Sequence, residues 1–426
     1  MPNRSKQSDD LALLKRCINE GRLFARHQRM AQIGALAEDG IDRAAFSVED
    51  LASRSMIVNW AEDRGFEVYL DEIANLSIRR PGRDREAPPI VIGGYIDTST
   101  DGHAYEGLVG ALIGLEVLEA LEEADLTTER SVEMTVWSNT QGERFGPPLM
   151  GAQIKAGTLS LEACRGLVDD RGIRLDDTLE RMFETFGSAL PRSRLTPMAG
   201  YIEPALDAGP DLAEMDMTVG LVRGAEAVGV VKLRLSGRTS PIANTSRDHR
   251  RDPLTDVIYL VNQLEEHIGE IPPSMGLRSG IAALEHDPFK PGTLPERVSL
   301  DWVLYSPDDD VLISLLEEAE SLVLAADIAS VLNCDAVVSR TARDFDDGLL
   351  EQVSKLARQD SLRFRTMSIG RPCNASVLSG AGIPTAMILV PNRRFLGVDA
   401  LRSVAKPDIG HAARLIAALA YQQATE

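Results

Sequence analysis

The stretch IVIGGYIDTSTDGHAYEGLVGALIGLEVLEAL, residues 90–121, predicts a strand, a polar loop and a helix in direct succession. The strand is the apolar run 90–92, which breaks at two glycines, 93 and 94. The helix is indicated by leucines that recur at helical spacing, namely Leu108, Leu112, Leu115 and Leu118. Polar residues that gather where a strand passes into a helix commonly form the site of an α/β protein. We therefore expect the functional site in this loop.

The rest of the chain repeats this alternation. A second buried strand, 132–137, ends in the polar turn 138–145, and strands that alternate with helices are typical of a largely parallel sheet covered on both faces. Further helices are predicted at 10–40, 47–64, 347–359 and 407–421, and further strands at 66–70, 74–79 and 385–390. The stretch 158–190 is predicted to be helical on both sides of a polar loop at 169–172.

A separate pattern occupies the middle of the chain. It reads as strand, helix, two strands, helix and a further strand, a βαββαβ-like run of roughly a hundred residues that could form an inserted α+β domain. The predicted members are strands at 228–237, 276–284 and 297–305 and helices at 253–268 and 308–324.

The charge balance limits the partners of this protein. Its 426 residues contain 45 Lys and Arg against 65 Asp and Glu, a net charge of −20. Nucleic acid and anionic membranes both require positive surface, so neither is expected as a partner. The four cysteines are scattered without a C-x-x-C pair, and the sequence lacks a long apolar run. A cytoplasmic location is expected.

Several phrases carry a resemblance to a known family. They are NEGRL at 19–23, AQIG at 31–34, DEIAN at 71–75, NTQGERF at 139–145, GA at 151–152 and RRD at 250–252. In this order they resemble the M20-type metallohydrolases, and within them the N-carbamoyl-L-amino-acid hydrolase and allantoate amidohydrolase branch.

The resemblance implies an α/β fold with a phosphorylase/hydrolase-like mixed sheet in a catalytic-type domain. An inserted lid or dimerisation domain divides that domain. We expect the first catalytic-type part at 1–212, the insert at 213–330 and the second catalytic-type part at 331–426. A homodimer formed through the insert is therefore expected.

The family's reaction uses two divalent metals to make hydroxide from water, with a glutamate as proton shuttle. This sequence departs from that set of residues. The positions of three histidine ligands resemble Tyr95, Tyr201 and Val398, and the bridging aspartate resembles Glu106. The catalytic glutamate is Thr140 and the next carboxylate ligand is Gln141. We therefore expect no metal cofactor, with Asp97, Glu106 and Gln141 as hydrogen-bonded remnants.

Two alternative sites remain open. Asp97, His103 and Glu106 could hold a single metal ion, although they lack H-x-x-x-H spacing. Cys373 could act as a nucleophile with Asp97 and Glu106 as acid and base, whereas a free cysteine is more often a small packed apolar residue.

The positions that would bind substrate have also changed. The lid histidine of the family resembles Pro241, and the arginine that grips a substrate carboxylate resembles Tyr305. Arg144 is retained in its context, as a structural ion pair with Glu143 or Asp97 or as a substrate contact. The residues expected to bind a small polar ligand are Tyr95, His103, Thr140, Gln141, Arg144, Tyr201 and Asn374.

The resulting hypothesis is a carbamoylase-fold protein without the dinuclear metal site. It would be a non-catalytic pseudo-hydrolase that binds a small polar molecule or pairs with an active homologue. The alternative is a metal-independent hydrolase that acts on a non-peptide C–N bond of an amide or ureido compound, using Asp97, Glu106 and Cys373. A scaffold alone cannot distinguish these two hypotheses, because function depends on the site.

Overall fold

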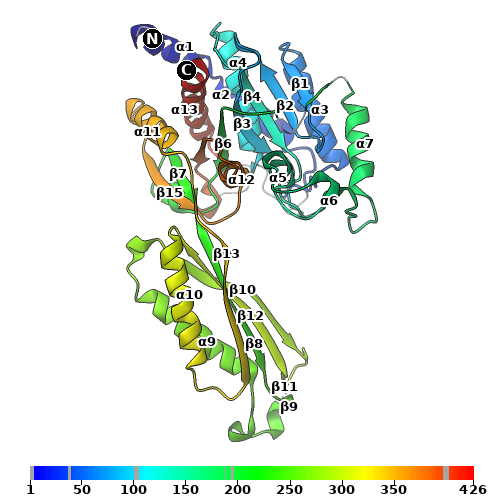
Figure 1. The fold of residues 1–426 in the computed structure, drawn as a ribbon, viewed down its shortest axis with the longest axis vertical. Helices are drawn as coiled ribbons and strands as arrows, with labels where there is room; N and C mark the ends of the chain where they lie inside the picture. The colour runs from blue at the N-terminus through cyan, green and yellow to red at the C-terminus, as the bar shows by residue number, and fades with distance from the viewer. Residues whose placement is uncertain (1–3, 37–39, 100–104, 188, 193–195, 397–402) are drawn as a thin grey trace. The chain divides into compact units, whose positions relative to one another are not determined.

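The computed structural model describes residues 4–36, 40–99, 105–187, 189–192, 196–396 and 403–426 (Figure 1). The chain forms two compact units. One, which we call the sheet unit, comprises Met1–Arg223, Phe345–Met367 and Pro372–Glu426. The other, the insert unit, comprises Gly224–Asp344 and Ser368–Arg371.

A mixed sheet forms the centre of the sheet unit, as the sequence pattern predicts. Its strand order is β14-β7-β16-β6-β3-β4-β2-β1-β5, and β15 also pairs with β7. The four strands β16, β6, β3 and β4 run parallel to their neighbours in that group, whereas β2 and β7 flank them in antiparallel orientation. The strands are β1 Glu67–Leu70, β2 Leu76–Arg80, β3 Ile90–Tyr95, β4 Val132–Trp137, β5 Leu190–Pro191, β6 Gly200–Leu206, β7 Val219–Ala225, β14 Arg343–Asp344, β15 Phe364–Ile369 and β16 Thr385–Val390. By residue, β14 and the last two residues of β7 and of β15 belong to the insert unit.

Helices cover the sheet of this unit. They are α1 Arg4–Cys17, α2 Glu20–Met30, α3 Val48–Glu62, α4 Leu108–Glu123, α5 Met150–Ala156, α6 Leu161–Arg165, α7 Leu175–Thr185, α8 Asp211–Glu214, α11 Asp347–Gln359, α12 Asn374–Gly380, α13 Lys406–Thr425 and the 3₁₀ helix η4 Arg393–Leu396. The single helix expected at 10–40 is wrong. The chain breaks before α2 because the Asn19 side chain accepts the N–H of Arg22 at 3.0 Å as an N-cap.

Helix α4 packs directly on β3, and glycines make this close approach possible. A Cβ on Gly94 would lie 2.4 Å from the backbone nitrogen of Ala111, and one on Gly110 would lie 2.6 Å from the carbonyl of Gly93. The helix is buried along almost its whole length, including two glutamates. Glu116 is paired with Arg22 at 2.7 Å, and Glu119 is paired with Arg26 at 2.8 Å. The strand-to-helix stretch therefore forms the centre of the core.

The insert unit has the expected βαββαβ order and its own core. Its four-stranded sheet is antiparallel throughout, in the order β10-β12-β8-β13. The main elements are β8 Ala227–Ser236, α9 Pro253–Gly269, β10 Arg278–Asp287, β12 Arg297–Ser306, α10 Asp309–Leu324 and β13 Val331–Arg340. Short elements are β9 Ser240–Pro241, β11 Thr293–Leu294, η1 Ile242–Asn244, η2 Arg247–His249 and η3 Pro273–Met275. In the described part of the chain, no helix is long and apolar enough to cross a membrane.

Candidate functional site

Asp97 follows strand β3 and is held by the turn that follows β4. Its side chain is 2% exposed, and its Oδ2 accepts the backbone N–H of Gln141 at 2.8 Å. Its Oδ1 is buried without a hydrogen-bond partner. Burial, assisted by the charge of Asp50, raises the pKa of Asp97 to about 6, although the N–H groups of Gln141 and Thr140 oppose the shift. Only one of the two carboxylate oxygens of Asp97 therefore has a hydrogen-bond donor.

The turn itself presents two more unpartnered polar atoms. Asn139 adopts a positive φ of 50°, and its Nδ2 donates to the carbonyl of Phe145 at 2.5 Å, while its buried Oδ1 has no partner. The buried hydroxyl of Thr140 also has no partner. We call Asp97, Asn139 and Thr140 the acceptor turn. Buried polar groups are normally hydrogen-bonded, so this group of exceptions needs an explanation.

Tyr95 ends strand β3 and packs on the glycine that precedes helix α4. A Cβ on Gly107 would lie 2.2 Å from the Tyr95 ring, and Gly107 has a positive φ of 38°. The ring is 7% exposed. Glu106 lies beside this glycine and is partly exposed. A side chain at Gly107 would therefore displace the Tyr95 ring.

Tyr201 is fully buried in a second aromatic contact. Its hydroxyl accepts a hydrogen bond from Trp137 Nε1 at 2.8 Å, and the two rings meet edge to face with centroids 5.9 Å apart. Gly93 makes room for the ring, since a Cβ there would lie 2.5 Å from it. Burial and the nearby charge of Glu203 raise the pKa of Tyr201 well above its usual range. The phenol is therefore neutral, and a neutral phenol is a poor metal ligand.

Glu203, which the sequence interpretation did not select, connects Tyr201 to helix α12. It is 2% exposed and accepts the N–H of Ala375 at 2.5 Å and the Nδ2 of Asn374 at 3.4 Å. Asn374 is buried, and its Oδ1 has no partner. The only signal available in the sequence was the position of Glu203 two residues after Tyr201 in an apolar strand. Tyr201 and Asn374 thus contact the same carboxylate, as part of one network.

Cys373 is the N-cap residue of helix α12. Its Sγ accepts the N–H of Ser376 at 3.3 Å, and the Ser376 hydroxyl lies 3.2 Å from the Cys373 backbone nitrogen, which completes a capping box. The side chain is 6% exposed. This geometry gives Cys373 a structural role that needs no nucleophilic chemistry.

The comparisons identify the relatives of this chain. No family model matches it. An N-carbamoyl-L-amino-acid amidohydrolase from Rhizobium meliloti is 26% identical over 379 residues, which is 88% of this chain and 89% of the relative. An allantoate amidohydrolase from Bacillus subtilis is 23% identical over 369 residues, covering 85% and 88% of the two chains. The homologues of the present chain are thus N-carbamoyl-L-amino-acid amidohydrolases and allantoate amidohydrolases.

Solved structures agree with these relatives. An amidase of the hydantoinase/carbamoylase family from Burkholderia multivorans superposes with a TM-score of 0.87 at 26% identity, covering 96% of this chain and 98% of that one. The aminopeptidase PepT from Bacillus cereus has a TM-score of 0.61 at 14% identity, which shows the fold alone. The resemblance to the carbamoylase and allantoate amidohydrolase branch is therefore confirmed, together with the fold class.

The resemblance implies a dinuclear metal site, and the described residues can be searched for its ligands. Among them, no group of three or more His, Cys, Asp and Glu could hold a metal ion. The side chains at the expected ligand positions include two phenols and the amide of Gln141. His103 and Val398 lie outside the described residues, so the single-metal alternative that includes His103 stays a prediction.

Arg144 is held by an ion pair within the sheet unit. Its Nε lies 2.9 Å from Asp169 Oδ2, and its Nη1 donates to the carbonyl of Ala45 at 2.8 Å. Its guanidinium also lies over the ring of Phe145, 5.0 Å from the centroid. Arg144 and Asp169 both line a cavity of about 430 Å³ that Thr98 also lines. The structure thus gives the arginine an ion-pair partner, Asp169, that the sequence interpretation did not consider.

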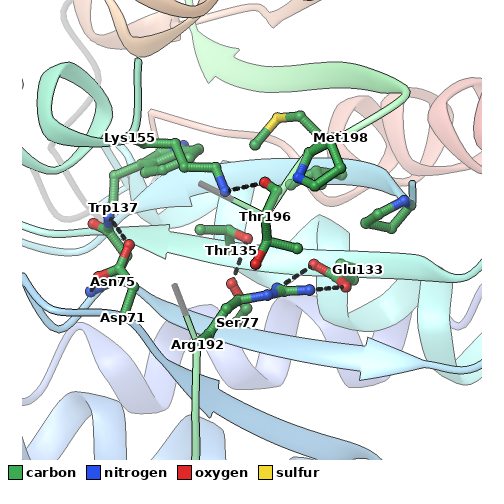
Figure 2. Close-up of a pocket in the computed structure, with 13 residues that line it drawn as sticks. Asp71, Asn75, Ser77, Glu133, Thr135, Trp137, Lys155, Arg192, Thr196 and Met198 are labelled. Carbon is green, nitrogen blue, oxygen red and sulfur yellow. Dashed lines mark hydrogen bonds and ion pairs between the residues drawn. The ribbon is translucent and has the colours of Figure 1, made fainter. Parts of the chain in front are cut away.

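A second polar region lies on the sheet and contains four charged residues (Figure 2). We call Asp71, Glu133, Lys155 and Arg192 the charged cluster. Arg192 binds both oxygens of Glu133 at 2.6 Å, and Lys155 donates to the carbonyl of Thr196 at 2.6 Å. Burial raises the pKa of Asp71 to about 6 and lowers that of Lys155 to about 8. The cavity between these residues measures about 20 Å³, which is room for roughly one water molecule.

Proposed function

We propose that this protein is a carbamoylase-fold protein that binds a small polar ligand at the acceptor turn and does not perform two-metal hydrolysis. The observation that supports this proposal most strongly is the state of Asp97. It is buried against the backbone of the turn that contains Thr140 and Gln141, with one oxygen unpartnered. The resemblance would place a proton-shuttling glutamate and a carboxylate ligand in that turn.

The surrounding side chains support a binding role. Thr140 has no acidic group to move a proton, and Tyr201 is neutral and engaged with Trp137. Tyr95 packs on Gly107. None of these groups can replace the ligands or the base that metal-assisted hydrolysis requires, whereas unpartnered polar atoms remain available to a ligand.

Metal content and turnover test the proposal together. Protein purified without chelator or added metal is expected to contain no stoichiometric metal and to show no rise in melting temperature with Zn, Mn, Co or Ni. A ligand of the folded state stabilises it by RT ln(1 + [L]/Kd), so a specific metal site would be visible in both measurements. Hydrolysis of N-carbamoyl-L-amino acids or allantoate, with about two metals bound per chain, would refute the proposal.

One observation favours the alternative of a metal-independent hydrolase acting on a non-peptide C–N bond. Asp97 combines an unpartnered oxygen with a pKa raised to about 6, and both properties suit a general base near neutral pH. This alternative predicts turnover of an amide or ureido compound that survives a chelator and is lost in Asp97→Asn. Absence of turnover across N-carbamoyl amino acids, allantoate and simple amides would instead favour the binding role.

We also propose that the insert unit forms a homodimer through the free edge of strand β10. This strand ends the four-stranded sheet, and it carries two exposed apolar side chains, Ile281 at 52% and Leu284 at 48%. An exposed apolar edge is suited to pairing with a second chain. Light scattering is expected to give a dimer that Leu284→Lys weakens, with Ile258→Lys as a control, because Ile258 is a similarly exposed apolar residue (56%) on helix α9. A monomer that associates only with an active homologue would indicate a heteromer.

A further inference from the structure

We propose that the acceptor turn binds a primary ammonium group, with the unpartnered oxygens of Asp97, Asn139 and Thr140 as its three acceptors. This inference rests on the proposed function and names the class of ligand for the same site. All three atoms are buried, and their residues are 2%, 0% and 7% exposed. They come from one turn and from the carboxylate bound to the backbone of that turn. A ligand that fits must supply donors to them.

The orientation of the Asn139 amide leaves its oxygen, a hydrogen-bond acceptor, without a partner. Its Nδ2 donates to the carbonyl of Phe145 at 2.5 Å and approaches the carbonyl of Pro147 at 3.5 Å. A carbonyl cannot donate, so the nitrogen of the amide must face these two groups, and the Oδ1 is left over. The buried oxygens of Asn139 and Asp97 therefore both require donors, and the Thr140 hydroxyl can accept as well.

Among the described residues no cation forms an ion pair with Asp97, although the charges of the buried Arg43 and Arg54 act on it. The hydrogen-bond donors of both arginines are directed to other groups. Arg54 pairs with Asp50 at 3.1 Å, and Arg43 donates to the carbonyls of Ile96, Met30 and Ile33 at 2.7 to 3.0 Å. A buried carboxylate without a bonded cation is costly, and a cationic ligand would remove that cost.

The number of free acceptors distinguishes an ammonium from a guanidinium. A guanidinium pairs best with both oxygens of a carboxylate, but Oδ2 of Asp97 already accepts the N–H of Gln141. An ammonium has three donors that radiate from one atom, which matches the number of unpartnered oxygens in the acceptor turn. A primary amine therefore matches this group of acceptors better than a planar cation.

A panel of small cations tests this inference on the full chain. Melting temperature and calorimetric binding would be measured with propylammonium, methylguanidinium, tetramethylammonium, potassium and N-carbamoylglycine, all at one ionic strength. Propylammonium is expected to give saturable binding that the other cations do not reproduce. Equal stabilisation by tetramethylammonium would indicate general charge screening, and equal stabilisation by potassium would indicate a metal-ion site. Tighter binding of methylguanidinium, or no binding of propylammonium, would likewise overturn the inference.

Substitutions locate the binding. Asp97→Asn is expected to weaken propylammonium binding at least tenfold, and Thr140→Val is expected to weaken it about threefold, since Val keeps the shape of Thr but lacks the hydroxyl. Asp42→Asn is the matched control, because Asp42 is a partly exposed acid that lines the neighbouring cavity rather than the turn. Binding that is unchanged in Asp97→Asn, or equally weakened in Asp42→Asn, would contradict the site.

The two proposals fail in different ways. Binding of N-carbamoylglycine without binding of propylammonium would overturn the ammonium site and leave the proposed ligand-binding function intact. Turnover of an N-carbamoyl amino acid by the same preparation would overturn the non-catalytic function. In that case, saturable binding of propylammonium that requires Asp97 would still support the ammonium site.

Discussion

The acceptor turn and the charged cluster are both buried polar groups in the sheet unit, but only one of them is complete. In the charged cluster, Glu133 has both oxygens bound by Arg192, and Asp71 accepts hydrogen bonds from Asn75 and Ile73. In the acceptor turn, three buried polar atoms have no partner. The same unit therefore contains one buried polar group whose carboxylates are hydrogen-bonded and one with unpartnered acceptors.

The difference shows which polar region serves the fold. A complete network stabilises and orients its own elements, and here it joins the segment around Arg192 and Thr196 to the sheet. An incomplete network costs stability unless something else completes it. The cavity of the charged cluster has room for roughly one water molecule, so it cannot hold a larger ligand. The acceptor turn is consequently the better candidate for binding.

The largest effect is expected from breaking the complete network. Arg192→Met would leave Glu133, which is 1% exposed, without its bidentate partner, and Arg79 at 3.6 Å can replace it only in part. Removing one partner of a buried ion pair typically costs about 3–5 kcal/mol. Urea unfolding should show this loss, and the double variant Glu133→Gln/Arg192→Met should lose less. An equal loss in the single and double variants would contradict the interpretation.

Removing the charge of Asp97 in the acceptor turn should stabilise the protein, which is the opposite of the effect expected for Arg192→Met. The pKa of Asp97 is raised in the folded state from 3.8 to about 6, so wild-type stability falls as pH rises through this interval and the penalty is complete above it. Asp97→Asn should therefore raise the free energy of unfolding by up to about 3 kcal/mol at pH 8. The gain should disappear below about pH 4, where the carboxyl is protonated in both states. A destabilised variant at pH 8 would contradict the comparison.

A smaller loss of stability is expected from a substitution at Gly93, which makes room for the Trp137–Tyr201 pair. In Gly93→Ala the new Cβ would lie 2.5 Å from the Tyr201 ring and 2.7 Å from Trp137 Nε1, so the pair must shift. Overpacking of this kind costs about 1–3 kcal/mol. Thermal unfolding and tryptophan fluorescence would report the change. Gly166→Ala is the control, since nothing lies within 4 Å of a Cβ there.

The smallest effect is expected at Cys373. Because the thiol caps helix α12, Cys373→Ser should change stability by less than about 1 kcal/mol, whereas Cys373→Ala should lose about 1 kcal/mol with the cap. Neither variant should alter ligand binding. A folded Cys373→Ser protein that loses a turnover present in wild type would restore the nucleophile hypothesis.

The sequence predicts the fold better than the details of the site. Apolar runs at 90–92 and 132–137 give the two parallel central strands, and the order of elements in the insert unit follows from local patterns. The apolar pattern does not predict the break between α1 and α2, because the break depends on the N-cap at Asn19 and on a contact of Asn19 with a distant helix. The backbone N–H of Asn19 donates to Glu116, 97 positions away in sequence.

The candidate site shows the same limit. The sequence pattern indicates Asp97, Thr140 and Gln141 as site residues, and in the structure Asp97 accepts backbone hydrogen bonds from the turn that contains the other two. It could not reveal that Oδ1 of Asp97 lacks a partner, since that depends on where every neighbouring donor points. The sequence does not indicate Glu203 for a related reason. Its hydrogen-bond donors come from helix α12, about 170 residues further along the chain.

The position of strand β16 has a consequence for synthesis of the chain on the ribosome. It lies between β6 and β7, yet it is made only after the whole insert unit. Until then, the edges of β6 and β7 that face β16 have no partner, and both strands are mostly apolar and mostly buried in the finished fold. The insert unit, whose strands and core are contiguous in sequence, can form during this interval. A nascent chain that stalls between the insert and β16 is thus exposed to aggregation at the centre of its future core.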